Sequence, residues 1–187
     1  MPARFPTPGR AIRVRSTLVF GPGSTTNGGA LLYFAYTALI DPDRMAVVSH
    51  DATFDFVAHL PEWGLTFPIP GNGRESGSLA TNWTGALPSA GPMPGSTVWG
   101  VVYSVPESDR SAIDTAEAAE RRQPLGVEVI DRTGRRHEVT AYVAESGNTR
   151  VVEPSPDYLE IMVGGSRHWD LPAGWIVGLE DHLGVEL

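Results

Sequence analysis

Glu117 has the chemistry and the position of a residue that could transfer protons. It follows Ile113 by four positions, so on a helix both side chains project from nearly the same face. A carboxylate on the apolar side of a helix is costly to bury unless another group uses it. Spacing alone leaves two interpretations. Glu117 either ends a helix, reaching water or pairing with Arg121 at i+4, or acts as a catalytic acid or base.

The residues before Glu117 predict how it is positioned. Residues 98–103 form an aromatic and β-branched run with the length of a buried strand. Ser104 and Glu107 have the spacing of a capping box, and Pro106 suits the first turn of a helix. We therefore predict a strand that leads directly into the helix carrying Glu117.

Composition limits the class of protein. A chain of 187 residues has the size of one domain with a real hydrophobic core. The absence of cysteine excludes a disulfide scaffold, a thiol nucleophile and a thiolate metal site. No apolar run approaches the ~18 residues of a membrane span, and the N-terminus lacks the apolar segment of a signal peptide. We expect a cytoplasmic protein that does not contact a membrane.

The charges are unevenly distributed along the chain. The net charge is −8, and all 14 basic residues are arginine, so neither a Schiff-base lysine nor a P-loop lysine is present. Residues 1–30 contain four arginines and no acidic residue, which leaves an acidic body that argues against nucleic-acid binding. We predict a flexible or loosely attached arm at 1–30 and one domain at 31–187. Arginine without lysine hints at a GC-rich genome and a role in specialised metabolism.

The rest of the sequence predicts an α+β fold. Residues 31–36 are apolar throughout, as expected of a central strand beside 98–103, and Asp41 should cap a short helix with Pro42 at its first position. Further strands are expected at 54–60 and 63–69, on either side of a Pro-Glu turn, and at 78–87, 125–130 and 137–143. A glycine-rich loop is expected at 71–78 and a linker at 88–94. One helix should run from 154–156 to Gly164-Gly165, and a final helix should cover 171–182. About six or seven short strands with flanking helices indicate a small mixed β-barrel or curled sheet.

Several familiar catalytic motifs are absent from the sequence. It contains no G-x-S-x-G nucleophile elbow and no Walker A motif. A Gly-x-Gly at Gly71 precedes no helix, so a dinucleotide site is not expected. The five histidines show no metal-ligand spacing. We expect neither a metal nor another cofactor.

Four motifs, in order, resemble the γ-glutamylcyclotransferase-like (AIG2-like) family. Leu32-Tyr-Phe-Ala-Tyr36 followed by Asp41-Pro-Asp-Arg-Met45 is similar to the family's opening Y-G-S-N-L-D-P-x-R-M. Val98-Trp-Gly-Val-Val-Tyr103 resembles its central strand, and Ile113-Asp-x-x-Glu117 resembles its L-D-x-x-E-G, in which the glutamate is catalytic. Pro154-Ser-Pro-x-Tyr158 resembles the start of its C-terminal helical pair. The resemblance covers roughly residues 31–182.

The resemblance implies a small barrel and a cyclisation that needs no cofactor. The α-amine of a γ-glutamyl substrate would attack its own γ-carbonyl, forming 5-oxoproline and releasing an amine. Closure of a five-membered ring supplies a large effective molarity, and a glutamate with a raised pKa can transfer the protons. By this resemblance Glu117 is the catalytic residue, and the substrate-binding residues are Tyr36, Thr37, Ala38, Leu39 and Tyr158. The partner would be a small molecule with an amide-linked glutamyl-like group, and the protein a monomer or homodimer.

The chain departs from the family pattern in the loop after Tyr36. Thr37-Ala38-Leu39 stands where the family has Gly-Ser-Asn, so a hydroxyl and an amide are lost, although backbone N–H groups remain for an oxyanion. Two interpretations follow: an active enzyme with a changed substrate, or an inactive member that binds a ligand or partner. For an active enzyme, we expect glutathione and free γ-glutamyl amino acids to be poor substrates, and less charged or larger amides to be better ones.

Overall fold

A computed structural model describes residues 26–27, 29–71, 83–145 and 153–183 of the chain. Its elements are β1 (Thr26–Asn27), β2 (Ala30–Ala35), η1 (Ala38–Ile40), α1 (Pro42–Val48), β3 (Thr53–Pro70), β4 (Ala86–Pro106), η2 (Glu107–Asp109), α2 (Arg110–Ala119), β5 (Arg122–Asp131), β6 (Arg136–Ala144), α3 (Pro156–His168) and α4 (Ala173–Asp181). Most of the predicted arm at 1–30, the loop at 71–78 and the start of the strand at 78–87 lie outside the described residues. Within 1–30, Thr26 and Asn27 pair with β2.

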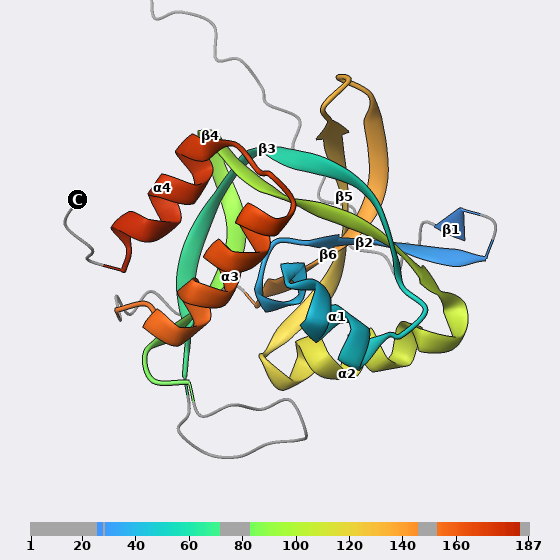
Figure 1. Ribbon diagram of the computed structural model, residues 1–187, viewed down its shortest axis with the longest axis horizontal. Coiled ribbons are helices and arrows are strands. Elements are labelled where there is room, and N and C mark those ends of the chain that lie inside the picture. The colour runs from blue at the N-terminus through green and yellow to red at the C-terminus, as the bar shows by residue number, and fades with distance from the viewer. Residues whose placement is uncertain (1–25, 28, 72–82, 146–152, 184–187) are drawn as a thin grey trace, which may run out of the picture.

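Five of the strands close into a mixed barrel. The sheet order is β1-β2-β4-β3-β5-β6, and β6 also pairs with β2 in parallel at Tyr33 and Thr140, which joins the two ends (Figure 1). The predicted α+β barrel with flanking helices is therefore confirmed. The strand count differs slightly from six or seven short strands because two long strands, β3 and β4, replace several shorter ones.

The two apolar runs that were expected at the centre of the sheet lie side by side there. β2 pairs antiparallel with the last six residues of β4, with Leu31 opposite Val105 and Ala35 opposite Val101. All four side chains are fully buried. Because both runs are apolar on both faces, each strand packs against the barrel interior on one side and the helices on the other.

The predicted turn at Pro61-Glu62 is wrong. β3 continues through it as one 18-residue strand, and its register against β4 shifts between Pro61 and Trp63. Glu62 adopts a left-handed backbone with φ 62°. A bulge of this kind bends a strand without ending it, which is how a proline-containing segment can remain in the sheet.

The predicted linker at residues 88–94 is also wrong, because this segment belongs to β4. Residues 86–92 of β4 pair with β3, whereas β2 pairs with residues 101–106 of β4. The proline-rich half of β4 thus belongs to a two-stranded ribbon, where a missing N–H removes no central ladder bond.

The predicted capping box does not form either. Ser104 lies inside β4 opposite Leu32, and α2 begins six residues later, after the short helix η2. Pairing with β2 extends the strand to Pro106, so the local capping signal is overridden by the sheet. The β5–β6 hairpin, in contrast, forms as predicted, with Gly134 in its turn at φ 86°.

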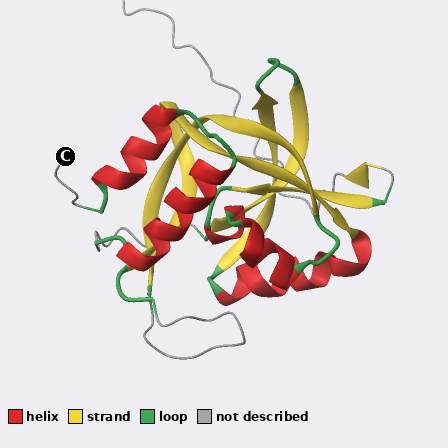
Figure 2. Cartoon of the chain, in the orientation of Figure 1, coloured by secondary structure: helices red, strands yellow, loops and turns green. Residues whose placement is uncertain are grey.

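The helices cover two regions of the barrel (Figures 1 and 2). The helix α1 begins as predicted, with the Asp41 side chain accepting from the Arg44 N–H at 3.0 Å, and it lies beside α2. The helices α3 and α4 pack together over the β3–β4 ribbon, where Leu159 and Leu179 share an apolar cluster with Ile69.

The predicted end of the third helix at Gly164-Gly165 is wrong, since α3 continues to His168. Gly165 serves a packing purpose instead. A Cβ at this position would lie 2.6 Å from Cγ2 of Ile40, so only glycine lets α3 approach η1 this closely. The final helix forms within the predicted range, as α4.

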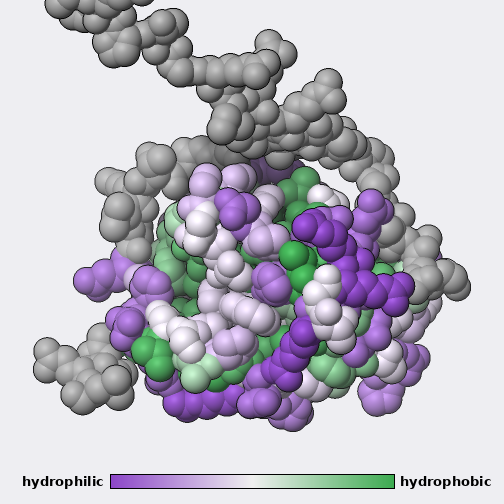
Figure 3. All heavy atoms as spheres, turned by 90° about the horizontal axis from the view of Figure 1, so that it is seen from above, coloured by the Kyte–Doolittle hydropathy of each residue, from purple (hydrophilic) through white to green (hydrophobic). Residues whose placement is uncertain are grey.

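The visible surface is mostly polar. Figure 3 shows one face, on which hydrophobic residues appear only in small areas between hydrophilic and neutral ones. Among the described residues, the exposed large apolar side chains are Val47, Phe54, Met93 and Val177. Among the helices of the described residues, none combines the length and the hydropathy required to cross a bilayer.

Candidate active site

Glu117 lies on the buried face of α2, as its spacing from Ile113 predicts. These two residues are the buried positions of the helix, with Ile113 fully buried and Glu117 3% exposed. Ile113 packs into an apolar cluster with β2 residues. The helix thereby holds a carboxylate against the barrel wall, where solvent cannot stabilise the charge and protein groups must do so.

Arg122 is the partner of Glu117, and the end of α2 explains how it reaches there. The helix stops at Ala119, and Arg121 takes a left-handed conformation with φ 58°. A left-handed residue after a helix reverses the chain direction, so the first residue of β5 turns back toward the helix. The Arg122 side chain is fully buried. The predicted alternative of a pair with Arg121 therefore names the wrong arginine.

Five side chains form what we term the Glu117 cluster: Tyr33, Glu117, Glu120, Arg122 and Tyr158. The Tyr33 hydroxyl donates to Oε1 of Glu117, and Nη1 of Arg122 donates to Oε2 at 3.0 Å. The same Nη1 donates to Glu120, and Nη2 donates to the Tyr158 hydroxyl at 3.1 Å. Tyr158 in turn donates to Glu120 at 2.6 Å. Every member is thus tied to another by a hydrogen bond.

The backbone holds the guanidinium in place. Nε of Arg122 donates to the Pro88 carbonyl at 2.9 Å, so β4 fixes the plane of the group. The cluster therefore draws on β2, α2, β5, α3 and a backbone carbonyl of β4. Because β2, β4 and α3 are far in sequence from the α2–β5 segment, the whole cluster forms only when the tertiary structure brings them together.

The cluster perturbs the ionisation of its members. Burial raises the pKa of Glu117 above its ordinary value, and the facing Arg122 opposes this effect. Burial alone would lower the pKa of Arg122, but Tyr158, Glu120 and Glu117 raise it well above its ordinary value. Burial and the nearby Glu117 also raise the pKa of Tyr33. The raised pKa of Arg122 keeps the guanidinium charged, whereas burial shifts the pKa of Glu117 upward, in the direction that favours its protonated form.

The predicted substrate-binding loop contacts this cluster through its backbone. Thr37, Ala38 and Leu39 are all buried, and the last two begin the short helix η1. The Ala38 N–H donates to the Tyr158 hydroxyl at 3.1 Å. The structure thus joins Tyr158 and the loop to Glu117 by way of Arg122. In this state the Ala38 N–H is occupied, so it is not one of the free oxyanion donors expected from the sequence.

Tyr36 lies apart from the hydrogen bonds of the cluster. Its hydroxyl donates to the Tyr142 carbonyl at 2.6 Å and accepts from the Ala90 N–H at 3.0 Å. These bonds tie β2 to β6 and β4, which is a structural use of the side chain. Sequence reasoning missed Tyr33, Glu120 and Arg122. The only available signal was the arginine pair after α2, and it could not show which arginine turns inward.

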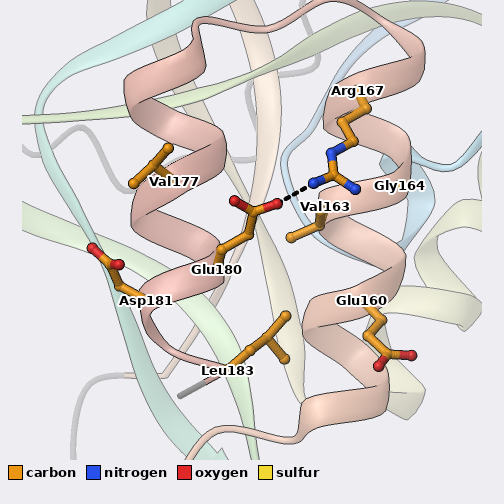
Figure 4. Close-up of a pocket in the computed structure, with 8 residues that line it drawn as sticks. All are labelled: Glu160, Val163, Gly164, Arg167, Val177, Glu180, Asp181 and Leu183. Atoms are coloured by element: carbon orange, nitrogen blue, oxygen red, sulfur yellow. Dashed lines mark hydrogen bonds and ion pairs between the residues drawn. The ribbon is translucent and has the colours of Figure 1, made fainter. Parts of the chain in front are cut away.

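A surface pocket lies elsewhere, between α3 and α4 (Figure 4). Its volume is about 470 Å³, and its lining comprises Glu160, Val163, Gly164, Arg167, Val177, Glu180, Asp181 and Leu183. Arg167 and Glu180 form an ion pair across it. The lining includes no member of the Glu117 cluster, so the pocket adds nothing to the chemistry of that site.

The fold and the cluster define a small closed α+β barrel with one buried carboxylate paired to an arginine. Comparison with known proteins identifies its class. The sequence model of the AIG2-like family matches residues 97–179. Gamma-glutamylcyclotransferase of Bos taurus is 30% identical over 146 residues, covering 78% of this chain and 75% of the relative. The Homo sapiens protein of that name is 29% identical over 143 residues, covering 76% and 73%.

A solved structure supports the same assignment. A gamma-glutamyl cyclotransferase superposes with a TM-score of 0.70 at 25% identity, covering 81% of this chain and 86% of that one. The chain belongs to the gamma-glutamylcyclotransferase-like (AIG2-like) family.

Proposed function

We propose that the protein is a cofactor-independent cyclotransferase-type enzyme that cleaves a γ-glutamyl or related amide, with Glu117 as the acid and base. The observation that carries the proposal is the burial of Glu117 within a hydrogen-bonded cluster, at the position where the family motif has its catalytic glutamate. Relatives at about 30% identity are named gamma-glutamylcyclotransferase. Perturbed ionisable groups with specific partners are frequent at functional sites.

The chemistry requires two proton transfers and no co-reactant. Glu117 accepts a proton from the substrate's α-ammonium, and the free amine attacks the γ-carbonyl carbon to form a tetrahedral oxyanion. The bond to the leaving nitrogen then breaks as that nitrogen takes this proton from Glu117. Glu117 next removes the second proton from the ring nitrogen and passes it to the released amine. Overall the ring nitrogen loses two protons and the leaving nitrogen gains two, so the products are 5-oxoproline and an ammonium. A carboxylate whose pKa is raised by burial is suited to both transfers.

The positions of the other groups suggest their tasks. The Tyr33 hydroxyl holds Oε1 of Glu117, which keeps the carboxylate in one orientation. Ring closure then derives most of its rate from placing the amine near the carbonyl. A substrate oxygen that needs the Ala38 N–H must replace the Tyr158 hydroxyl, which now occupies it.

The altered loop bears on the carboxylate end of the substrate. Ala38 and Leu39 are buried and apolar, so neither side chain can pair with a substrate carboxylate. A charge left unpaired there would weaken binding by roughly 2–4 kcal/mol. The proposed substrate is therefore an amide of a neutral or larger amine. Glutathione and free γ-glutamyl amino acids should be poor substrates.

One observation favours a second candidate, an inactive family member that binds a ligand or partner. Both oxygens of Glu117 are already occupied, by Tyr33 and Arg122, and the side chain is 3% exposed. A base in this state must first open its ion pair before it can reach a substrate ammonium.

A turnover assay separates the two candidates. Release of 5-oxoproline is measured for γ-glutamyl-alanine, glutathione and several neutral γ-glutamylamines with wild-type protein and Glu117→Gln. We expect wild-type protein to turn over the neutral γ-glutamylamines and Glu117→Gln to show no turnover. The control Glu128→Gln removes an exposed carboxylate and should retain activity. Equal turnover by wild type and Glu117→Gln would remove Glu117 from the mechanism. Silence on every substrate would favour the binding protein.

A further inference from the structure

Glu120 is the one carboxylate of the Glu117 cluster that can leave it easily. Its side chain is 21% exposed, against 3% for Glu117 and none for Arg122. Glu120 also lies at the C-cap of α2, where the helix has already ended. A side chain at a helix end with access to water loses little when it turns outward, because water replaces its hydrogen bonds.

The contacts of Glu120 are those that a ligand carboxylate would need. Its Oε2 accepts from Nη1 of Arg122 and from the Tyr158 hydroxyl. A guanidinium and a hydroxyl beside each other form a typical carboxylate site, because both donate and neither carries negative charge. If Glu120 turns outward, Arg122 and Tyr158 are left with unused donors in a buried place.

The spacing to Glu117 fits the head group of an amino acid. The Oε2 atoms of Glu117 and Glu120 both contact the same nitrogen of Arg122, so ~6 Å at most separates them. In an α-amino acid the ammonium and the carboxylate share one carbon. With its carboxylate in the place of Glu120, the ammonium comes within hydrogen-bonding reach of Glu117.

Charge balance favours the same exchange. With both glutamates ionised, one arginine faces two carboxylates, and the cluster carries a net charge of −1. Departure of Glu120 leaves a neutral Glu117–Arg122 pair, which a zwitterionic head group can enter without adding net charge. A ligand with a carboxylate but no ammonium, such as 5-oxoproline, should bind less well than such a zwitterion, although its carboxylate still gains the donors of Arg122 and Tyr158 that a neutral amide does not use as well.

We infer that Arg122 and Tyr158 bind the α-carboxylate of the substrate, and that Glu120 occupies this site until the substrate displaces it. This inference rests on the proposed cyclisation and adds the residues that recognise the α-carboxylate beside the attacking α-ammonium. It places the recognition of that carboxylate on β5 and α3 rather than on the loop, where Ala38 and Leu39 have no polar side-chain groups.

The test measures binding rather than turnover. Titration calorimetry compares 5-oxoproline, which keeps the carboxylate, with 5-oxoprolinamide, in which it is a neutral amide. Wild-type protein should bind the acid at least about tenfold more tightly than the amide, since a charge-assisted contact is lost. Arg122→Gln should abolish this preference, and Arg122→Lys should restore part of it. Glu120→Gln should bind the acid more tightly than wild type, because the competing carboxylate is gone.

Two exposed residues provide matched controls. Arg136→Gln and Glu128→Gln change the net charge by the same amounts at an exposed ion pair, and they should leave the preference unchanged. Should Arg122→Gln fail to fold, Glu120→Gln still decides the matter.

Some outcomes would overturn the inference. The inference fails if wild-type protein binds 5-oxoproline and 5-oxoprolinamide equally, or binds neither. It also fails if Glu120→Gln binds 5-oxoproline less tightly than wild type. Such a result alongside Glu117-dependent turnover would leave the cyclisation intact without this carboxylate site. Arg122-dependent binding of the acid without any 5-oxoproline release would reject the cyclisation and keep the site.

Discussion

Removing Arg122 should damage the protein far more than removing Glu117. In Arg122→Met, Glu117 and Glu120 remain beside each other without their cation, and Glu117 is 3% exposed. Breaking a buried ion pair from one side in this way costs about 3–5 kcal/mol. In Glu117→Gln, Arg122 keeps Glu120 as a counter-charge, so we expect a change within about 1 kcal/mol, of either sign.

The assay is urea unfolding of a double-mutant cycle. Wild type, Glu117→Gln, Arg122→Met and the double variant are compared, with Arg136→Met as an exposed control that should change little. The double variant should be more stable than Arg122→Met alone, because the uncompensated charge of Glu117 is gone. Equal losses in the two single variants, or a double variant less stable than Arg122→Met, would refute the reasoning.

The dependence on pH provides a second check on the same cycle. Burial raises the pKa of Glu117 when folded, so the native state binds more protons than the unfolded state above the ordinary value of 4.5. Stability from this group is complete below that value and is lost as the pH rises through the folded pKa. Without Arg122 no cation opposes the effect of burial on the pKa of Glu117. As the pH rises, Arg122→Met should therefore lose more stability than wild type. The double variant, which lacks the Glu117 carboxylate, should lose less stability than wild type over the same pH range.

Three further outcomes are expected. Gly165→Ala should destabilise by about 1–3 kcal/mol in urea unfolding, because its Cβ would meet Ile40, whereas Gly164→Ala, with open space around it, should be neutral or stabilising. A loss from both variants would contradict the packing argument. Tyr158→Phe leaves two buried donors, the Ala38 N–H and Nη2 of Arg122, without an acceptor, so it should cost about 1–3 kcal/mol and lower the kcat of any turnover; unchanged stability would show that water replaces the hydroxyl. In the pH profile of kcat/KM, the midpoint of the acid limb should lie above the ordinary pKa of a glutamate. Any activity that remains in Glu117→Gln should lack this limb. A midpoint at the ordinary value would indicate that an exposed carboxylate acts as the base.

Local patterns in the sequence determined a large part of this fold. The apolar runs at 31–36 and 98–103 lie in neighbouring central strands and pair at Tyr33–Ala35 and Val101–Tyr103, because residues that are apolar on both faces must be covered on both sides. Asp41 caps α1, and the β5–β6 hairpin forms at its turn. The spacing of Ile113 and Glu117 placed the carboxylate on the buried face of α2. Each of these signals depends on neighbours within a few positions, so the sequence is sufficient to reveal it.

Contacts between distant segments decided the rest. A bulge at Glu62 and a proline-rich ribbon remain in the sheet because strand pairing outweighs local turn signals. Gly165 lies inside α3, where it allows the helix to pack closely against η1. A local sequence pattern cannot show this contact, because η1 is far away in the sequence. Above all, the sequence by itself presented a carboxylate beside two arginines, and only the left-handed turn at Arg121 and the closure of the barrel made Arg122 the buried partner of Glu117. The energy of a buried charge depends on every group around it, and those groups come from five segments that only the tertiary structure brings together.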